Sequence, residues 1–168
     1  MKKCIYLFIL SFVFIACSTK KTINITTDSK VSTVEEKESS SSYVQFRDDF
    51  TKVSETTKTK FLDKQKASAS NYAVLFLTHG YKGEHVIVKS ANKKYFEGTT
   101  YTVKSNDVAG YLRIKNDEDL IVTDNYTNKQ AVIESKYLKE YKFVYVLKDN
   151  ANKAQPYKIT YSNSLRPL

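Results

Sequence analysis

Cysteine is scarce in this sequence. The 168 residues include only Cys4 and Cys17, and no cysteine follows Cys17. Because a disulfide needs two cysteines, residues 18–168 hold no disulfide among themselves, and thiol chemistry is excluded there. A domain in this region must therefore be stabilised by an apolar core.

Long apolar runs are also missing. The run at residues 4–15 is well short of the roughly 20 apolar residues that a transmembrane helix requires. It follows Lys2 and Lys3, and the small residue Ala16 separates it from Cys17. A basic start, a short apolar region and a small residue before a cleavage point are typical of a secretory signal peptide.

The end of this run resembles a known processing motif. Phe14, Ile15, Ala16 and Cys17 resemble the lipobox of bacterial lipoproteins, in which Leu more often stands where this chain has Phe14. The resemblance implies removal of residues 1–16 as a signal peptide, by cleavage between Ala16 and Cys17. It also implies that Cys17 carries a diacylglycerol and that its new amine is often acylated, for example with palmitate. Because each buried methylene contributes about 0.8 kcal/mol, two or more acyl chains form an effectively stable membrane anchor.

The residues after Cys17 bear on where such a lipoprotein resides. In this family, Asp after the cysteine is associated with inner-membrane retention, and this chain has Ser18. Similar lipoproteins at the surface of some bacteria carry acidic residues there, whereas this chain continues with STKK. The resemblance therefore implies the cell envelope, with the outer membrane and a periplasm-facing position favoured over surface exposure.

Two segments separate the signal peptide from the main domain. Residues 17–42 contain no aromatic residue and close on a serine run, which predicts a flexible tether with a reach of roughly 25 to 30 Å. Residues 43–70 form a lead-in whose apolar residues recur three and four positions apart, the spacing of one helix face. Because the threonine-rich residues 56–59 lower helix propensity, the lead-in is either a short helix or an irregular, partly stranded segment. The spaced residues are Phe46, Phe50, Val53, Thr57 and Phe61.

Residues 71–168 contain many short stretches in which apolar and polar residues alternate. The whole sequence has 13 Tyr and 9 Phe but no Trp, 4 Gly and 2 Pro, so β-prone aromatic residues are abundant. Short alternating stretches with polar turns between them predict an all-β fold, a small antiparallel β-sandwich of about 7–9 strands. Residues 72–78 and, within the stretch 141–148, residues 143–147 are apolar on both faces, which places these strands centrally. The expected strands are residues 72–78, 85–90, 94–98, 100–103, 110–115, 119–124, 130–135, 141–148 and 156–162.

One of these stretches resembles a strand of a known fold family. Residues 138–148 resemble, over this short length, the late strand of immunoglobulin-like and fibronectin type III sandwiches, where a tyrosine precedes alternating apolar residues. The resemblance implies an immunoglobulin-like or similar sandwich. Residues 71–168 lack the Cys and Trp landmarks of that family. The row of alternating residues is Tyr141, Phe143, Tyr145 and Leu147.

Residues with catalytic or metal-binding chemistry are few and scattered. The candidate metal ligands flank a glycine-containing turn and are His79, Glu84 and His85. No fourth ligand accompanies them, although a structural zinc site needs four. The alternative is that they are solvated residues of the turn. No G-x-S-x-G or H-E-x-x-H motif is present. The acids at residues 117–119 lie between two expected strands, as polar turn residues do. The sequence therefore predicts a protein that is not an enzyme and that holds no metal or cofactor.

Positive charge exceeds negative charge but is not concentrated. The sequence has 27 Lys and Arg against 18 Asp and Glu, a net charge of +9, without a basic block. Only Arg47, Arg113 and Arg166 are arginines, so the planar fork that suits phosphate recognition is scarce. No nucleic-acid partner is therefore expected.

The many tyrosines suggest what the domain contacts. Tyr157 and Tyr161 share one face of an expected strand and form the candidate ligand face; packing within the core is the alternative. We therefore expect a lipid-anchored envelope protein whose sandwich is a non-catalytic binding or structural module. The alternatives are a glycan-binding module that uses exposed tyrosines and an inhibitor or immunity-type protein that blocks a protein partner.

Overall fold

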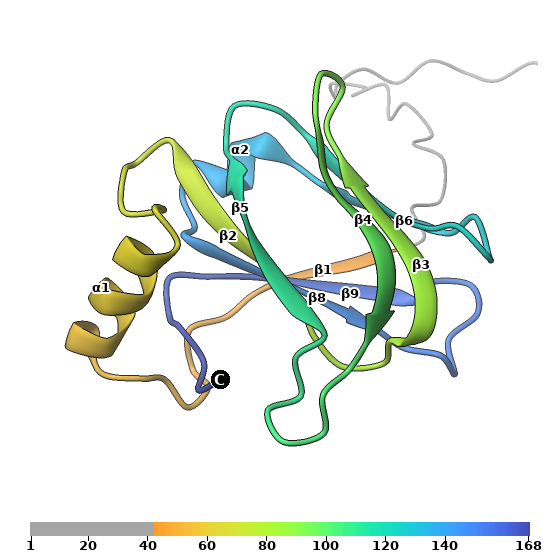
Figure 1. The fold of residues 1–168 in the computed structure, drawn as a ribbon, viewed down its shortest axis with the longest axis horizontal. Helices are drawn as coiled ribbons and strands as arrows, with labels where there is room; N and C mark the ends of the chain where they lie inside the picture. The colour runs from red at the N-terminus through yellow and green to blue at the C-terminus, as the bar shows by residue number, and fades with distance from the viewer. Residues whose placement is uncertain (1–41) are drawn as a thin grey trace, which may run out of the picture. The chain divides into compact units, whose positions relative to one another are not determined.

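The computed structural model describes residues 42–168, which form a mostly β structure of nine strands and two short helices (Figure 1). The predicted signal peptide, the lipidation of Cys17 and all of the predicted tether but Ser42 lie outside the described residues. Within the described part, no helix is both long and apolar enough to cross a membrane. In chain order the elements are β1 (Ser42–Phe46), α1 (Glu55–Lys64), β2 (Tyr72–Leu77), β3 (Lys82–Lys89), β4 (Lys94–Tyr101), β5 (Gly110–Lys115), β6 (Leu120–Asp124), β7 (Gln130–Ile133), α2 (Ser135–Leu138), β8 (Phe143–Lys148) and β9 (Tyr157–Ser162).

The strands form two sheets that share a core in a sandwich-like arrangement (Figure 1). The five-stranded sheet has the order β1-β9-β8-β2-β5, and the four-stranded sheet has the order β4-β3-β6-β7. Each stretch predicted as a strand after residue 71 corresponds to one of β2 to β9, with the third and fourth stretches joined in β4. β2 and β8 lie inside the five-stranded sheet, which confirms the central position predicted from their apolar sequences.

The five-stranded sheet is mixed, where we predicted antiparallel pairing. β2 pairs parallel with β8, and β1 pairs parallel with β9. All pairs of the four-stranded sheet are antiparallel. The chain between β2 and β8 builds the whole four-stranded sheet before it returns, so these partners are distant in sequence. Alternation predicts that a segment is a strand but carries no information on the direction of a distant partner.

The lead-in contains both a strand and a helix. β1 extends the edge of the five-stranded sheet, so the sheet includes residues that we placed before the domain. α1 begins after Ser54, whose side-chain oxygen accepts a hydrogen bond from the Thr57 amide as an N-cap. Phe46, Phe50 and Val53, which the helical spacing included, precede this helix.

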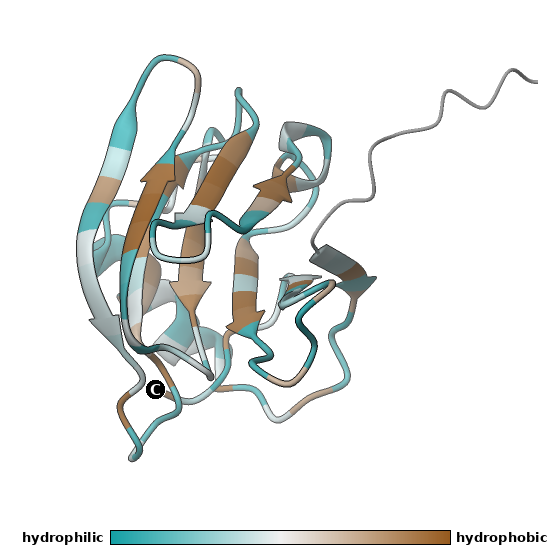
Figure 2. Cartoon of the chain, turned by 90° about the vertical axis from the view of Figure 1, so that its right-hand side faces the viewer, coloured by the Kyte–Doolittle hydropathy of each residue, from teal (hydrophilic) through white to brown (hydrophobic). Residues whose placement is uncertain are grey.

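Two apolar clusters stabilise the domain. The larger cluster lies between the sheets and includes buried residues such as Val88 and Ile159. The smaller cluster lies on the outer face, which we define as the face of the five-stranded sheet directed away from the four-stranded sheet. There Phe76 and Tyr145 are covered by residues of α1, the lead-in and the C-terminal segment, including Leu165. Figure 2 shows apolar residues along the strands and hydrophilic residues in the turns.

Candidate ligand-binding site

Two pockets flank the hairpin loop, the name used here for residues 149–156 between β8 and β9. The outer pocket has a volume of about 240 Å³, and the end pocket has a volume of about 350 Å³. Asp149 and Asn152 line both pockets. The side chains discussed below are Tyr43, Leu147, Asn152, Gln155 and Lys158 in the outer pocket, and Thr127, Lys129, Lys148, Asn150 and Lys153 in the end pocket.

Hydrogen bonds fix the hairpin loop in place. The Asp149 amide donates to the Pro156 carbonyl oxygen at 2.7 Å and closes the base of the loop. The Gln155 amide donates to Asn152 Oδ1 at 3.0 Å. Asn150 Nδ2 donates to a main-chain oxygen of the β2–β3 turn at 2.7 Å. Asn and Asp side chains form such local bonds readily, which explains why the chain turns here and why the loop has a defined shape.

A row of outward-facing side chains on three adjacent strands lines the outer pocket. In the sheet register, Leu147 of β8 pairs with Lys158 of β9, and Lys158 pairs with Tyr43 of β1. Tyr43 is 56% exposed, and the other two residues are half-buried. Because side chains alternate along a strand, the flanking residues face the core while this row faces outward. The outer pocket thus combines an aromatic ring, an apolar side chain and a cation.

A buried ion-pair network next to the end pocket joins the two sheets. Lys148 Nζ of β8 lies 2.6 Å from Asp124 Oδ2 of β6 and 2.8 Å from Glu84 Oε1 of β3. The side chains of Lys148 and Asp124 are 7% and 0% exposed. Burial alone would raise the pKa of both carboxyls, but hydrogen bonds from Lys148 and neighbouring donors outweigh burial and lower both pKa values. Burial opposes the charge of Lys148 as well, but the two carboxylates raise its pKa overall. The network is therefore charged at neutral pH.

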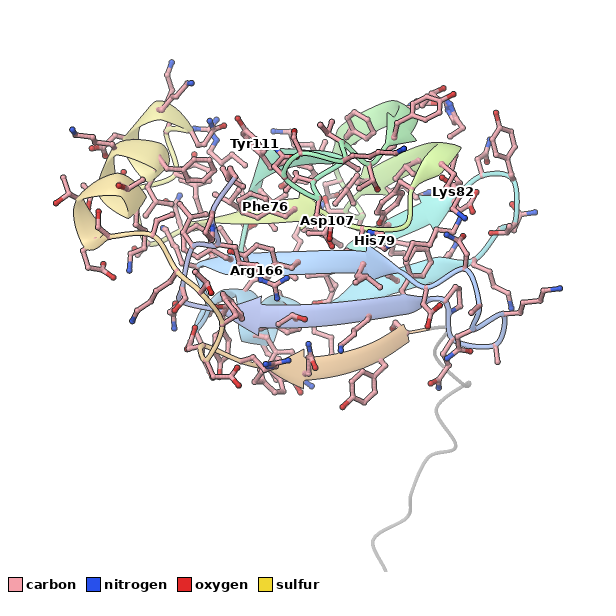
Figure 3. The ribbon with its side chains drawn as sticks, turned by 90° about the horizontal axis from the view of Figure 1, so that it is seen from below. Phe76, His79, Lys82, Asp107, Tyr111 and Arg166 are labelled. Atoms are coloured by element: carbon pink, nitrogen blue, oxygen red, sulfur yellow. The ribbon has the colours of Figure 1, made fainter. Side chains whose placement is uncertain are left out.

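Arg166 lies on the outer face and contacts two aromatic rings. Its guanidinium carbon is 4.2 Å from the ring centre of Phe50 and 4.3 Å from that of Tyr145. The Arg166 amide also donates to the Tyr145 hydroxyl at 3.1 Å. Burial raises the pKa of Tyr145 to about 12 and lowers the pKa of Arg166. Within residues 42–168, the buried Nε of Arg166 has no hydrogen-bond partner. Figure 3 looks onto this face and shows Arg166 together with Phe76 and Asp107.

The three candidate metal ligands have different partners. His79 Nδ1 lies 2.6 Å from Asp107 Oδ1, and His85 Nε2 lies 3.4 Å from Glu97 Oε1. Glu84 belongs to the buried ion-pair network, because adjacent residues of a strand point to opposite faces and Glu84 points inward. Among residues 42–168, no group of three or more His, Cys, Asp or Glu side chains is arranged to hold a metal ion.

Tyr157 and Tyr161 share one face of β9, but that face is turned into the core. The two residues are 1% and 0% exposed. The Tyr161 hydroxyl accepts a hydrogen bond from the Glu134 amide at 3.0 Å, and burial raises the pKa of both tyrosines. These tyrosines therefore do not form an exposed ligand face, but Tyr157 is one of the residues that line the outer pocket. Alternation identifies residues that share a face, but it does not identify which face is inward.

No protein-family model matches the chain, and no curated protein matches it. The function must therefore be inferred from the geometry of the pockets. The residues of the outer face that the sequence did not mark as a site are Tyr43, Asn152, Gln155, Lys158 and Arg166. The amide-rich sequence of the hairpin loop was a usable signal for part of this set. Nothing in the sequence indicates that Tyr43 and Arg166, at opposite ends of the described chain, share one sheet face.

Proposed function

We propose that this protein is a membrane-anchored lipoprotein of the bacterial envelope whose β domain is a non-catalytic binding module. The N-terminal pattern supports the anchor, with cleavage after Ala16 and lipid on Cys17. The residues after Cys17 support a periplasm-facing position at the outer membrane. The outer pocket carries the binding proposal, because it places an exposed aromatic ring, two amides and a lysine on one fixed surface.

The chemistry of both pockets favours binding over catalysis. Amides, lysines and an exposed tyrosine form hydrogen bonds and stacking contacts with a ligand. Among the described lining residues, neither pocket contains a histidine or a cysteine, and Asp149 is the one carboxylate. The Asp149 carboxylate accepts a hydrogen bond from the Ala151 amide at 2.9 Å, which is a turn contact. General acid–base or nucleophilic catalysis needs a second activating group within hydrogen-bond reach.

The outer pocket best supports a glycan-binding module. In it Tyr43, rather than Tyr157 or Tyr161, would be the exposed tyrosine that contacts the glycan. The alternative is an inhibitor or immunity-type protein that blocks a protein partner. β1 favours this alternative, because a strand at a sheet edge can pair with a strand of another protein. The immunoglobulin-like character of the sandwich is also a proposal, supported by the alternating outward residues of β8.

The anchor is tested by metabolic labelling with a radioactive fatty acid. We expect label in the full-length protein and none after Cys17→Ala, which removes the acceptor thiol. Cys4→Ala is the matched control and should retain the label, because Cys4 leaves with the signal peptide. Label in the Cys17→Ala variant, or none in the unmodified sequence, would contradict the anchor.

The binding role is tested by capture of envelope components on the full-length protein held in detergent micelles. Tyr43→Ala and Asn152→Ala should each abolish capture, because they remove the exposed ring and a loop amide from the outer pocket. Tyr101→Ala is the matched control, since Tyr101 is also exposed but lies on β4. Capture that both outer-pocket variants retain would exclude this pocket as the binding site. Digestion of the captured material with protease separates a glycan ligand from a protein ligand.

A further inference from the structure

We propose that the outer pocket binds a saccharide that carries an oxyanion, and that Arg166 and Lys158 hold this anion. The oxyanion is a carboxylate, as in a uronic acid, or a phosphate. The inference rests on the proposed binding function and names its ligand class. It joins two features of the outer face: Arg166, which lies outside the lining of the outer pocket, and the outer pocket itself, which Lys158 lines.

Arg166 is a half-buried cation that forms no ion pair among the described residues. Within the same part of the chain, its Nε is buried without a hydrogen bond. Asp107 contributes negative charge nearby, but its carboxylate is bound to His79. The rings of Phe50 and Tyr145 lie 4.2 Å and 4.3 Å from the guanidinium carbon and are inclined at 82° to each other, so at most one of them covers a face of the guanidinium. The guanidinium is a planar fork of N–H donors that fits two oxygens of a carboxylate or phosphate.

The sheet register brings Lys158 near the same anion. Tyr145, which contacts Arg166, pairs with Thr160 of β9. Lys158 precedes Thr160 by two residues and faces the same way, so it lies in the next outward row, about 7 Å along the strand. The flexible four-carbon stem of lysine lets its ammonium lean across this spacing. None of the ion pairs within residues 42–168 includes Lys158, so its charge is available to a ligand.

Tyr43 and the hairpin loop provide contacts for a sugar ring beside this anion site. Tyr43 is the neighbour of Lys158 on β1, and its exposed ring offers a flat apolar face with a polar tip. Asn152 and Gln155 line the same pocket, and each amide has both donors and an acceptor for sugar hydroxyls. A free anion would not use the ring and the amides. A neutral sugar would leave both cations without a partner.

Isothermal titration calorimetry with the full-length protein in detergent tests this inference. The ligands are trigalacturonic acid, its fully methyl-esterified form and glucose 6-phosphate. The ester keeps the size and hydroxyls of the acid but removes its charge, and the sugar phosphate supplies the other oxyanion. We expect at least one anionic ligand to bind, and the ester to bind about tenfold or more weakly than the acid if the carboxylate is recognised. The two anionic ligands distinguish carboxylate from phosphate.

Variants assign the binding to individual residues. Arg166→Gln should weaken binding of the anionic ligand about tenfold or more, and Lys158→Gln about two- to fivefold. Arg166→Lys keeps the charge without the fork and should give an intermediate affinity. The matched controls are Arg113→Gln, another arginine that lies over an aromatic ring, and Lys89→Gln on β3 of the other sheet. Both controls should leave the affinity unchanged, and a thermal melt checks that every variant folds.

Each contrary outcome has a distinct meaning. Equal affinity for the acid and its ester, with no binding of the sugar phosphate, would overturn the anion inference and leave the binding function intact. Equal losses in Arg166→Gln and Arg113→Gln would assign the attraction to overall positive charge and would also overturn it. If no saccharide binds but envelope capture still depends on Tyr43, the ligand class is wrong and the binding function stands. If capture is also independent of the outer pocket, both proposals fail.

Discussion

Replacing Lys148 with Met should destabilise the domain and reverse part of its pH dependence. Met has a flexible apolar side chain of similar length, so the variant keeps much of the stem packing and loses the ammonium. Asp124 and Glu84 then remain between the sheets without the cation that bonds to both of them. The substitution therefore isolates the electrostatic role of the network from its packing role.

The magnitude follows from what the two carboxylates retain. Breaking a buried ion pair by removal of one partner costs about 3–5 kcal/mol. Asp124 keeps hydrogen bonds from the Tyr126 amide and from Thr127 Oγ1, both at 2.9 Å. Glu84 is 13% exposed and can gain some hydration. These contacts reduce the penalty, so we expect a loss of about 3 kcal/mol in the free energy of unfolding at pH 7.

The pH dependence follows from the direction of each pKa shift. In the unmodified protein the pKa values of Asp124 and Glu84 are lowered, so their stabilisation is complete above their unfolded pKa values and is lost as the pH falls through the folded values. In the variant, burial without a cation raises both pKa values. Stability is then highest below the unfolded pKa values and falls as the pH rises through the folded values. The difference between the two proteins should therefore shrink from neutral pH towards about pH 4.

Urea denaturation followed by far-ultraviolet circular dichroism measures this difference at the two pH values. Lys89→Met on β3 is the matched control, and this exposed position should change stability by less than about 0.5 kcal/mol. The double variant Lys148→Met with Asp124→Asn should recover part of the loss, because one of the unpaired charges is gone. A loss below about 1 kcal/mol at pH 7, or an equal loss at both pH values, would refute the role given to the network.

The same denaturation assay tests two other positions. Gly80→Ala should cost about 3 kcal/mol, because Gly80 has a φ of 98° and an added Cβ would lie 1.7 Å from the Lys148 carbonyl oxygen. Gly110→Ala is the control, since its Cβ would meet no atom within 4 Å, and similar losses at both glycines would contradict this reasoning. Asp48→Ala should cost about 1 kcal/mol at pH 7, because Asp48 Oδ1 accepts hydrogen bonds from a hydroxyl and two amides of residues 162–164. Burial alone would raise the pKa of Asp48, but these bonds lower it, so its stabilisation is present above the unfolded pKa of about 3.9 and is lost as the pH falls. A deficit in Asp48→Ala that persists unchanged into acid would show that these bonds do not depend on the charge.

Alternation was sufficient to locate most strands, because each strand buries at least one face. In β5 the alternate apolar residues Leu112 and Ile114 pack on the core between the sheets. The same local signal missed β1, whose parallel partner β9 lies at the other end of the described chain. A short edge strand is recognisable only through its partner, and pairing at that distance leaves no mark on the local sequence.

In the lead-in, the spacing of apolar residues predicted which side chains are buried more reliably than it predicted a helix. Phe50, Val53 and Phe61 all pack on the smaller cluster, as one face of a helix would, but only Phe61 lies within α1. An irregular segment can direct side chains to one surface without helical periodicity. For the same reason the outer-face residues could not be predicted together. Arg166 reaches Phe50 and Tyr145 only because the last residues of the chain return across the sheet.

The position of β1 has a mechanical consequence. Tyr43 is the second residue of this strand, so β1 contains both a ligand contact and the connection to the upstream chain. Tension between that chain and a ligand held by Lys158 passes through the β1–β9 pair, because Lys158 lies on β9. Five paired positions run along these parallel strands, so a pull along β1 loads several backbone hydrogen bonds together. The protein can thus bear tension through the backbone hydrogen bonds at one edge of a sheet.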